Sequence, residues 1–421
     1  MRERSDAGTE VTRAPGGAAQ ELPPVELAGL VALVASVQGL ATFAALALST
    51  LAPKVAPTFG VGAEIVGYQV SLVYVSAAAL STFAGLFVRR HGAGTISLTA
   101  VLIGAVGLTG LASGDLLIAT VASLLIGLGY GLTNPAASHL LWRFGPSRHR
   151  NLVFALKQTG VPLGGVLAAL LLPSASEIVG WQGAILVGTT LYLVLALLLW
   201  RRRPRWDEDR DPGARIHGAL LEGMRLAMRD PTLRGLSIMG LGYASAQLCL
   251  LTFVVTMLVQ ELGWSLVAAG GMATLTQIGG AAGRIGWSVL AQKIDRGIEV
   301  LICLGLASAL CALLLATVTP DWPKPALAAL LFVFGLCLVG WNGLYMAEMA
   351  RASRPESIGL ATGAVLVFSF VGIMVGPAMF ATIYKLDGSY AVTFGVMSLL
   401  PLIGAAALVP VLRGGRREHS R

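Results

Sequence analysis

The chain has 421 residues, of which 55% are hydrophobic and only 12% are charged, and its mean hydropathy is +0.76. Soluble domains carry about 25% charged residues, so this composition excludes an ordinary soluble globular protein. A net charge of +8 could suit nucleic-acid binding, but the basic residues are spread over alternate loops of an apolar chain, which argues against that partner.

Twelve apolar stretches are long enough to cross a lipid bilayer as helices. About 20 residues at 1.5 Å per residue span a hydrocarbon core of roughly 30 Å, whereas barrel strands would be alternating segments of about ten residues. The sequence therefore predicts an all-α membrane protein. The predicted spans are 27–51, 65–88, 95–113, 116–141, 152–174, 181–200, 235–259, 266–290, 298–318, 325–350, 357–384 and 390–412.

Basic residues favour one side of these spans. The N-terminal tail and alternate loops hold 25 of the 30 Lys and Arg residues, and the opposite loops hold only Lys54, Lys324 and Lys385. Lys157 and Arg284 lie inside spans. Because cytoplasmic loops carry such an excess, both termini are predicted to be cytoplasmic. The arginine-rich and alanine-rich composition suits a bacterium, so we expect a multi-pass protein of the inner membrane.

A polar linker divides the spans into two sets of six. We predict a disordered tail over 1–26, a first bundle over 27–200, a linker over 201–234, a second bundle over 235–412 and a tail over 413–421. The second part of the linker has apolar residues at helical spacing, which predicts a helix on the membrane surface or, alternatively, a solvated linker helix. These apolar residues are Ile216, Leu220, Leu221, Met224 and Met228.

The sequence lacks the motifs of soluble enzymes. It has no H-E-x-x-H metal motif, no G-x-S-x-G nucleophile motif and no G-x-x-x-x-G-K-[ST] phosphate loop. We therefore expect no enzymatic activity, no cofactor, no metal and no direct use of ATP. The four cysteines lie in predicted spans without C-x-x-C spacing, so we predict that they are small buried hydrophobic residues.

The two halves resemble one another at an offset near 208 residues. Span four ends NPAASHLLWR from Asn134, and span ten ends NGLYMAEMAR from Asn342. Span two ends GLFVRRHG, and span eight ends SVLAQKID. Span five carries GVPLGG at the position where span eleven carries GIMVGP. Three matches in the same order indicate duplication of a six-helix unit, so the two bundles are predicted to be pseudo-symmetric.

Twelve spans in two halves, a basic central loop and these inner-mouth sequences resemble the major facilitator superfamily over residues 27–412. The loop signature of that family has its first glycine, its arginine and its second glycine at Gly85, Arg90 and Gly92, but Arg89 stands at the aspartate position. The second half departs further from it. Its corresponding residues are Ser288, Gln292 and Lys293.

The resemblance implies alternating access, in which two bundles rock about a central site, in a protein that is usually a monomer. Spans one, four, seven and ten would line the cavity, and Gly85, Arg90, Gly92, Gln292 and Lys293 would form cytoplasmic gate loops. The arginine that the family carries in span four is missing. The drug antiporters of the family have two residues between a proline and a Gly-Gly pair. Here only Leu163 separates Pro162 from Gly164 and Gly165, so the spacing is one residue short.

Ionisable residues inside spans are the strongest functional candidates, because each costs about 2.5–3.5 kcal/mol to insert. Arg284 in span eight can bind a carboxylate through two parallel hydrogen bonds, and organic-anion carriers of the family often place an arginine on this span. Its alternative is a structural pair with Glu348. Lys157 in span five could complete a positive site, or could extend to the headgroups instead.

Two further residues could carry a proton or form a gate. Glu348 is the one acid clearly inside a span, and its alternative role is a gate salt bridge. His139 could accept a proton or could pack at the interface.

Uncharged polar and aromatic residues on the spans could line the substrate cavity or could join helices. They are Gln38, Tyr74, Tyr130, Asn134, Gln247, Trp341, Asn342 and Tyr345.

The predicted function is secondary active transport of a small organic anion, such as a carboxylate, with proton symport. The partners would be a small-molecule substrate and the lipid bilayer. The alternatives are efflux of a hydrophobic or cationic compound, for which Glu348 would be needed, and a non-transporting membrane sensor or membrane enzyme.

Overall fold

The structure is a computed structural model that describes residues 22–146, 150–213, 225, 228–353 and 358–419. All regular structure in this part of the chain is helical. The elements of the first half are α1 (Pro24–Phe59), η1 (Ala63–Ile65), α2 (Val66–His91), α3 (Ala93–Leu111), α4 (Leu116–Phe144), α5 (Arg150–Gln158) and α6 (Gly160–Trp206). Those of the second half are α8 (Pro231–Gln260), α9 (Leu266–Ile294), α10 (Gly297–Leu315), α11 (Lys324–Leu338), α12 (Asn342–Ala352), α13 (Ile358–Asp387), α14 (Tyr390–Met397) and α15 (Leu399–His419).

Ten helical stretches among the described residues are long and apolar enough to cross a membrane. One of them, Val153–Trp206, has 54 residues and would be about 80 Å long if straight, which is more than twice the hydrocarbon thickness. It turns at Gly180, whose φ of 73° and ψ of 169° suit only glycine. The twelve-span prediction has two further crossings. They would be the part of α6 that follows Gly180 and the less apolar helix α9.

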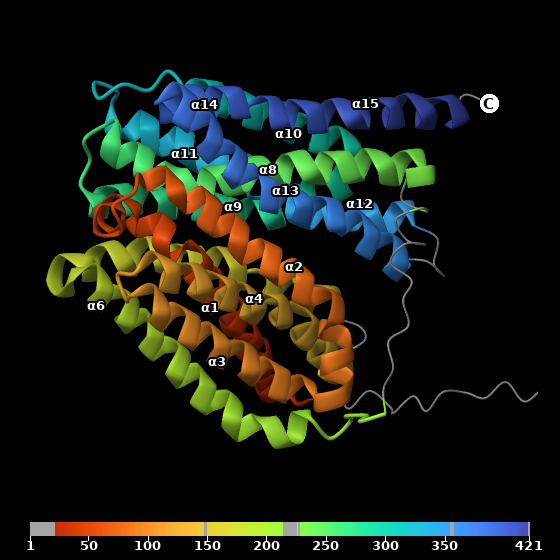
Figure 1. Ribbon diagram of the computed structural model, residues 1–421. Helices are drawn as coiled ribbons and strands as arrows, with labels where there is room; N and C mark the ends of the chain where they lie inside the picture. The colour runs from red at the N-terminus through yellow and green to blue at the C-terminus, as the bar shows by residue number, and fades with distance from the viewer. Residues whose placement is uncertain (1–21, 147–149, 214–224, 226–227, 354–357, 420–421) are drawn as a thin grey trace, which may run out of the picture.

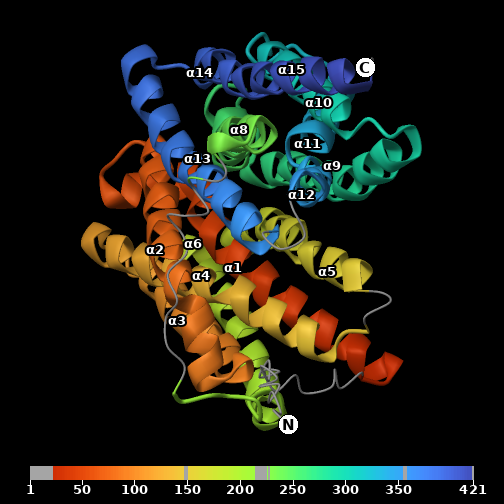
Figure 2. The same cartoon turned by 90° about the vertical axis from the view of Figure 1, so that its right-hand side faces the viewer.

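The helices form two bundles, α1–α6 and α8–α15, that lie side by side (Figures 1 and 2). We call the end that carries Arg89, Arg143 and Arg351 the basic end, and the end that carries Gly180 and Gly388 the opposite end. Helix α2 packs on α13, the first arm of α6 on α9, and α1 on α8. The described chain begins and ends at the basic end, where Arg205 near the end of α6 pairs with Glu26 of α1 at 2.7 Å.

The bundles meet at the opposite end and diverge at the basic end (Figure 1). At the opposite end, a Cβ atom on Gly67 of α2 would lie 2.3 Å from the carbonyl oxygen of Pro377 of α13. Tyr68 on α2 is hydrogen-bonded through its hydroxyl to Thr382 Oγ1 on α13 at 2.9 Å. Nearer the basic end of α2, a Cβ atom on Gly85 would meet no heavy atom within 4 Å. The same pair of helices is therefore in contact at one end and apart at the other.

Small residues let α6 approach α1 closely. A Cβ atom on Gly164 would lie 1.9 Å from the carbonyl oxygen of Gly39, and one on Gly160 would lie 2.3 Å from that of Ala35. Glycines four residues apart on one helix face produce this kind of backbone contact within membranes. Pro162 falls in the first turn of α6, where a missing amide hydrogen breaks no helical hydrogen bond.

Several predicted boundaries were wrong because tertiary contacts extend or interrupt the helices. Helix α1 continues to Phe59, whose ring packs on Trp181 at 5.9 Å between centroids. The predicted linker begins too early, since α6 runs to Trp206. Predicted span ten is interrupted between α11 and α12, and α15 extends into the predicted tail as far as His419.

The remaining expectations about the tails, the linker and the cysteines have mixed outcomes. Most of the predicted linker helix and of the predicted N-terminal tail lies outside the described residues. Cys249, Cys311 and Cys337 are buried as predicted, but Cys303 is exposed on α10, which corrects the prediction for that residue.

We predict that Gly164→Leu destabilises the folded protein by about 1–3 kcal/mol or more, because a branched side chain cannot fit against the backbone of α1. The measurement is the melting temperature in detergent, together with the yield of monodisperse protein. Gly271→Leu is the matched control, since a Cβ atom there would meet nothing within 4 Å. Equal melting temperatures for the two variants would show that the close contact is unimportant.

Candidate functional site

Arg284 of α9 reaches across to the first bundle at a point where two helices are interrupted. Its Nη1 donates to the carbonyl oxygen of Gln158, the last residue of α5, at 3.1 Å. Its Nε donates to the carbonyl oxygen of Val339, just after α11, at 3.4 Å. Carbonyl groups at helix C-termini lack intrahelical partners and carry partial negative charge, so they suit a cation. Arg284 therefore joins the two bundles.

Lys157 of α5 is only 1% exposed and donates through Nζ to Oδ1 of Asn134 on α4. It precedes Gln158, whose backbone carbonyl accepts from Arg284, so Arg284 contacts the residue next to Lys157 in the chain. Asn134 itself is exposed, at the level where the bundles diverge. The sequence predicted that Lys157 and Arg284 could form one positive site, and this stays a prediction.

Neither cation has an acidic partner in the described part of the chain. No carboxylate oxygen there lies within 4.0 Å of the Lys157 ammonium or the Arg284 guanidinium. The alternative pairing of Arg284 with Glu348 is not observed. Glu348 lies instead 3.8 Å from Arg351 and against Gly297 at the start of α10. In the described part of the chain, neutral dipoles are the recorded partners of the buried Lys157 and the half-buried Arg284.

Two tyrosines pack together where the first and second bundles meet. Tyr74 of α2 and Tyr130 of α4 meet edge to face, with ring centroids 5.2 Å apart. Tyr74 also packs with Leu248 of α8, so this cluster spans both bundles. Tyr74 is only 5% exposed, and Tyr130 is half-buried.

The other predicted polar residues form an internal two-fold pattern. Thr133 Oγ1 is hydrogen-bonded to Gln38 Oε1 at 3.1 Å, which joins α4 to α1. In the second bundle, Trp341 Nε1 donates to Gln247 Oε1 at 2.9 Å, and Asn342 Nδ2 donates to the same oxygen at 3.2 Å. The glutamines are 209 positions apart, close to the sequence offset. Thr133 was missed by the sequence analysis, although it stands 208 positions before Trp341.

Trp341 and Tyr345 were expected to line the cavity, but each is 1% exposed within the core of the second bundle. Their rings pack at 4.8 Å between centroids, and the Tyr345 hydroxyl is hydrogen-bonded to Ser369 Oγ at 3.1 Å. The repeat-related asparagines also differ in their partners, because Asn134 binds Lys157 and Asn342 binds Gln247. In this conformation, the group at the bundle interface is therefore smaller than the predicted set. It consists of Tyr74, Tyr130, Asn134, Lys157 and Arg284.

The predicted gate residues lie at the basic end, and acids that the sequence analysis passed over organise this region. His139 Nε2 lies 2.7 Å from Asp209 Oδ2, and Arg143 pairs with the other oxygen of Asp209 at 2.8 Å. Asp207 accepts from the amides of Gly94 and Thr95 at 2.7 and 3.0 Å, at the start of α3. An acid at a helix N-terminus is a stabilising arrangement, and it holds the start of the linker against the first bundle.

The signature positions themselves make few contacts. Gly92 adopts a φ of 92°, and a Cβ atom there would lie 2.2 Å from Asp207 Oδ1, so glycine is required for this turn. Arg90, Gln292 and Lys293 are exposed at the ends of α2 and α9, and Gly85 faces open space. They lie at the diverging end, and their role as gate loops stays a prediction.

A family model described as "Major Facilitator Superfamily" matches residues 33–377. The chain belongs to the major facilitator superfamily. It is therefore a multi-pass membrane protein with the all-α fold of that family, as the sequence resemblance predicted.

Several relatives in the superfamily are similar over much of the chain. A gallate transporter of Pseudomonas putida is 30% identical over 341 residues, covering 72% of this chain and 71% of the relative. A 3-(3-hydroxy-phenyl)propionate transporter of Escherichia coli is 28% identical, covering 97% and 98%. An uncharacterised MFS-type transporter of Mycobacterium tuberculosis is 24% identical over 287 residues, and the match spans 62% of that relative.

Solved structures support the fold. A crystal structure of the peptide transporter POT superposes with a TM-score of 0.74 and covers 94% of this chain and 97% of its own, at 13% sequence identity.

We predict that Gln247→Leu destabilises the protein more than Gln38→Leu. The first change removes the acceptor of two donors, one of them the buried indole of Trp341, and an unpaired buried donor costs about 1–3 kcal/mol. The second change removes one interhelical hydrogen bond, worth about 0.6 kcal/mol in membranes. Melting temperatures in detergent test this order, with the exposed Gln182→Leu as control. A larger effect at Gln38 would contradict the asymmetry.

Proposed function

We propose that this protein is a secondary active transporter that moves a small organic anion, an aromatic carboxylate in particular, across a bacterial inner membrane by alternating access. The observation that carries the proposal is the presence of two cations within the helices, the buried Lys157 and the half-buried Arg284, with no carboxylate partner among the described residues. Cytoplasmic termini and symport with protons are parts of the same proposal.

Charge balance is the first argument. A buried cation in an apolar span is costly unless another group compensates it. Arg284 uses Nε and Nη1 on carbonyl oxygens, and Lys157 donates to a single amide oxygen. A substrate carboxylate would supply the missing negative charge and could accept charge-assisted hydrogen bonds from both side chains.

Ring stacking is the second argument. Tyr74 and Tyr130 pack edge to face between the bundles, with Tyr130 half-buried, and aromatic pairs add about 0.5–1.5 kcal/mol beyond area burial. A substrate with a carboxylate at one end and a ring at the other would therefore match both parts of the site. The names of relatives agree with this chemistry, since they include gallate, 3-(3-hydroxy-phenyl)propionate and 4-hydroxybenzoate transporters.

The arrangement of the bundles supports alternating access. They touch at the opposite end through Gly67 and Tyr68 and diverge at the basic end, where Asn134 is exposed. With the predicted orientation, the substrate site would open toward the cytoplasm in this state. Transport would require the contact between α2 and α13 to separate while their basic ends approach each other.

Efflux of a cationic compound has less support. A cation would meet Lys157 and Arg284 at the bundle interface, and like charges repel. The buried acid Glu348 lies toward the basic end, beside Arg351, which favours a gate ion pair over substrate binding.

We predict that Arg284→Gln and Lys157→Gln each raise the KM for 4-hydroxybenzoate uptake by about tenfold to a hundredfold. Hydrogen bonds to a charged group contribute about 1.5–3 kcal/mol, which corresponds to this range. The double variant should abolish uptake. The measurement is tracer uptake into proteoliposomes reconstituted with equal amounts of folded protein.

Arg284→Lys and Lys54→Gln are the matched controls for this experiment. The first keeps the charge and should retain part of the activity, although lysine lacks the planar fork. The second removes a lysine that pairs with Glu177 at the opposite end, 2.8 Å away, and should leave KM unchanged. If the double Gln variant transports the carboxylate like the unmodified protein, the positive site is wrong.

Proton symport makes a separate prediction. Uptake of 4-hydroxybenzoate should accelerate when the outside of the proteoliposome is made more acidic than the inside, and a protonophore should remove the acceleration. The control is the same pH on both sides, which fixes the ionisation of the substrate. An uptake rate that is indifferent to the gradient would exclude proton coupling and leave anion binding intact.

A further inference from the structure

The part of α6 that follows Gly180 has an exposed apolar face. Figure 1 shows this arm on the outer side of the first bundle, away from α8–α15. Leu193, Val194, Leu197 and Leu198 are between 45% and 59% exposed. In a membrane protein, an apolar face on the outside of a bundle contacts lipid chains.

Arg201 continues this face at the basic end. Val194, Leu197 and Arg201 follow one another at three-residue and four-residue steps, which place them on the same side of a helix, and Arg205 lies one turn further. Both arginines are exposed. Since the leucines lie in the hydrocarbon, the guanidinium of Arg201 would lie at the level of the lipid phosphates.

Trp200 marks the same level of the membrane. Its side chain is 57% exposed, and the Arg203 guanidinium lies over its ring at 4.5 Å from the ring centroid. Tryptophan is enriched where the hydrocarbon meets the headgroups. The exposed surface of α6 therefore passes from apolar side chains to an interfacial indole and then to cations.

The acidic residues that follow α6 bind other groups. Asp207 accepts from backbone amides at the start of α3, and Glu208 and Asp209 both pair with Arg143. Asp211 accepts from the amide of Gly213 at 3.0 Å. These contacts use the nearby carboxylates without involving the first arginines at the end of the exposed face.

Arg201 and Arg202 are exposed, and no carboxylate oxygen lies within 4.0 Å of either guanidinium in the described part of the chain. Arg205 pairs with Glu26 at 2.7 Å, but both side chains are exposed, and an ion pair of this kind contributes little. The end of the lipid-facing surface therefore carries positive charge without a fixed counter-ion.

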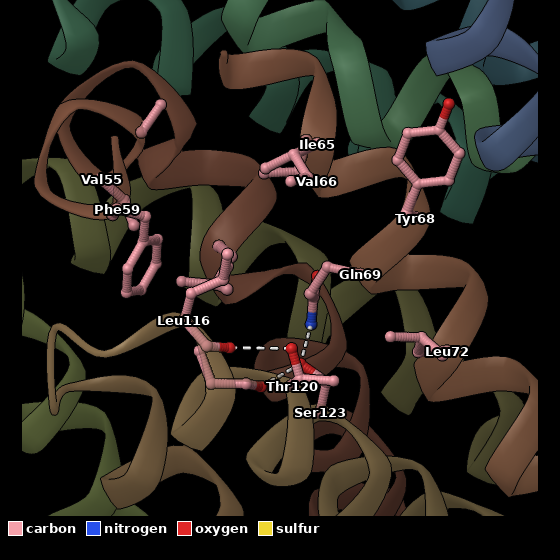
Figure 3. Close-up of a pocket in the computed structure, with 13 residues that line it drawn as sticks. Val55, Phe59, Ile65, Val66, Tyr68, Gln69, Leu72, Leu116, Thr120 and Ser123 are labelled. Atoms are coloured by element: carbon pink, nitrogen blue, oxygen red, sulfur yellow. Dashed lines mark hydrogen bonds between the residues drawn. The ribbon is translucent and has the colours of Figure 1, made fainter. Parts of the chain in front are cut away.

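Another hollow of the first bundle is apolar and carries no such charge. It is a cavity of about 190 Å³ between α1, α2 and α4, with Phe59 and Leu72 in its wall and no lysine or arginine (Figure 3). Its polar groups include Gln69 and Ser123, which bind each other at 3.1 Å. Because this cavity offers apolar contact alone, it provides an internal control for headgroup recognition.

We propose that the end of α6 binds an anionic phospholipid, whose phosphate contacts Arg201 and Arg202 and whose acyl chains lie along the exposed apolar face. A guanidinium can bind two phosphate oxygens through parallel hydrogen bonds. Basic clusters that directly follow a membrane span attract lipids with a net negative headgroup. This inference does not depend on the proposed function, because it concerns the outer surface of one bundle.

The experiment measures binding of fluorescently labelled phosphatidylglycerol to the purified full-length protein in detergent by fluorescence anisotropy. Unlabelled dioleoyl phosphatidylglycerol and dioleoyl phosphatidylcholine are matched competitors, because they share their chains and their phosphate but differ in net charge. The expected result is saturable binding that phosphatidylglycerol displaces at least about tenfold more effectively than phosphatidylcholine. Glycerol phosphate, which has the phosphate without the chains, should not displace the labelled lipid.

The double variant Arg201→Gln/Arg202→Gln should weaken this binding by about tenfold to thirtyfold, since each arginine near an anionic surface contributes about fivefold. Arg201→Lys/Arg202→Lys keeps the charge and should retain most of the affinity. Lys54→Gln/Lys324→Gln removes the same charge at the opposite end, and Leu72→Phe fills the uncharged cavity. Both of these control variants should bind the lipid like the unmodified protein.

Melting temperatures confirm that each variant is folded before its affinity is compared. Unchanged affinity in the folded double Gln variant would overturn the proposal, and so would equal displacement by the two lipids or the absence of saturable binding. Displacement by glycerol phosphate as effective as that by phosphatidylglycerol would identify a site for free phosphate and would also overturn it.

Discussion

A charged side chain inside an apolar helix needs a compensating group, and the candidate site of this protein follows from how that need is met. Lys157 and Arg284 are placed where two pairs of helices are interrupted, α5 from α6 and α11 from α12. The interruptions leave carbonyl oxygens free, and Arg284 binds one from each. These dipoles make the cations tolerable but do not neutralise them, because the described chain brings no acid to either. We propose that a substrate anion supplies the missing negative charge.

Close backbone packing gives the bundles the rigidity that such a site requires. Gly160 and Gly164 bring α6 against α1. Gln38 and Gln247, at equivalent positions in the two halves, each accept a hydrogen bond from another helical segment of their own bundle. Two rigid units that touch at one end and diverge at the other can exchange those contacts without changing their interiors. The arrangement therefore connects the duplicated sequence to alternating access.

Features set by local sequence could be predicted, and those set by tertiary contacts could not. Apolar length and the distribution of arginine gave the spans and the family, since both are properties of a helix in lipid. The two cations inside the spans were recognisable for the same reason. Their partners were not, because Asn134 and the Gln158 carbonyl reach them only after the helices break and pack. Asp207 was overlooked as an ordinary linker acid, and its binding to the start of α3 depends on the fold. The role of Thr133 could have been found by applying the repeat offset to Trp341.

The central claim is that the negative charge of the substrate completes the pair formed by Lys157 and Arg284. Isothermal titration of the purified protein with 4-hydroxybenzoate and with 4-hydroxybenzamide tests it most directly, because the two molecules share their ring and hydroxyl and differ in the charge. The account predicts that the carboxylate binds at least about tenfold more tightly, since charge-assisted hydrogen bonds are roughly twice as strong as neutral ones. Equal affinity for the amide would contradict it.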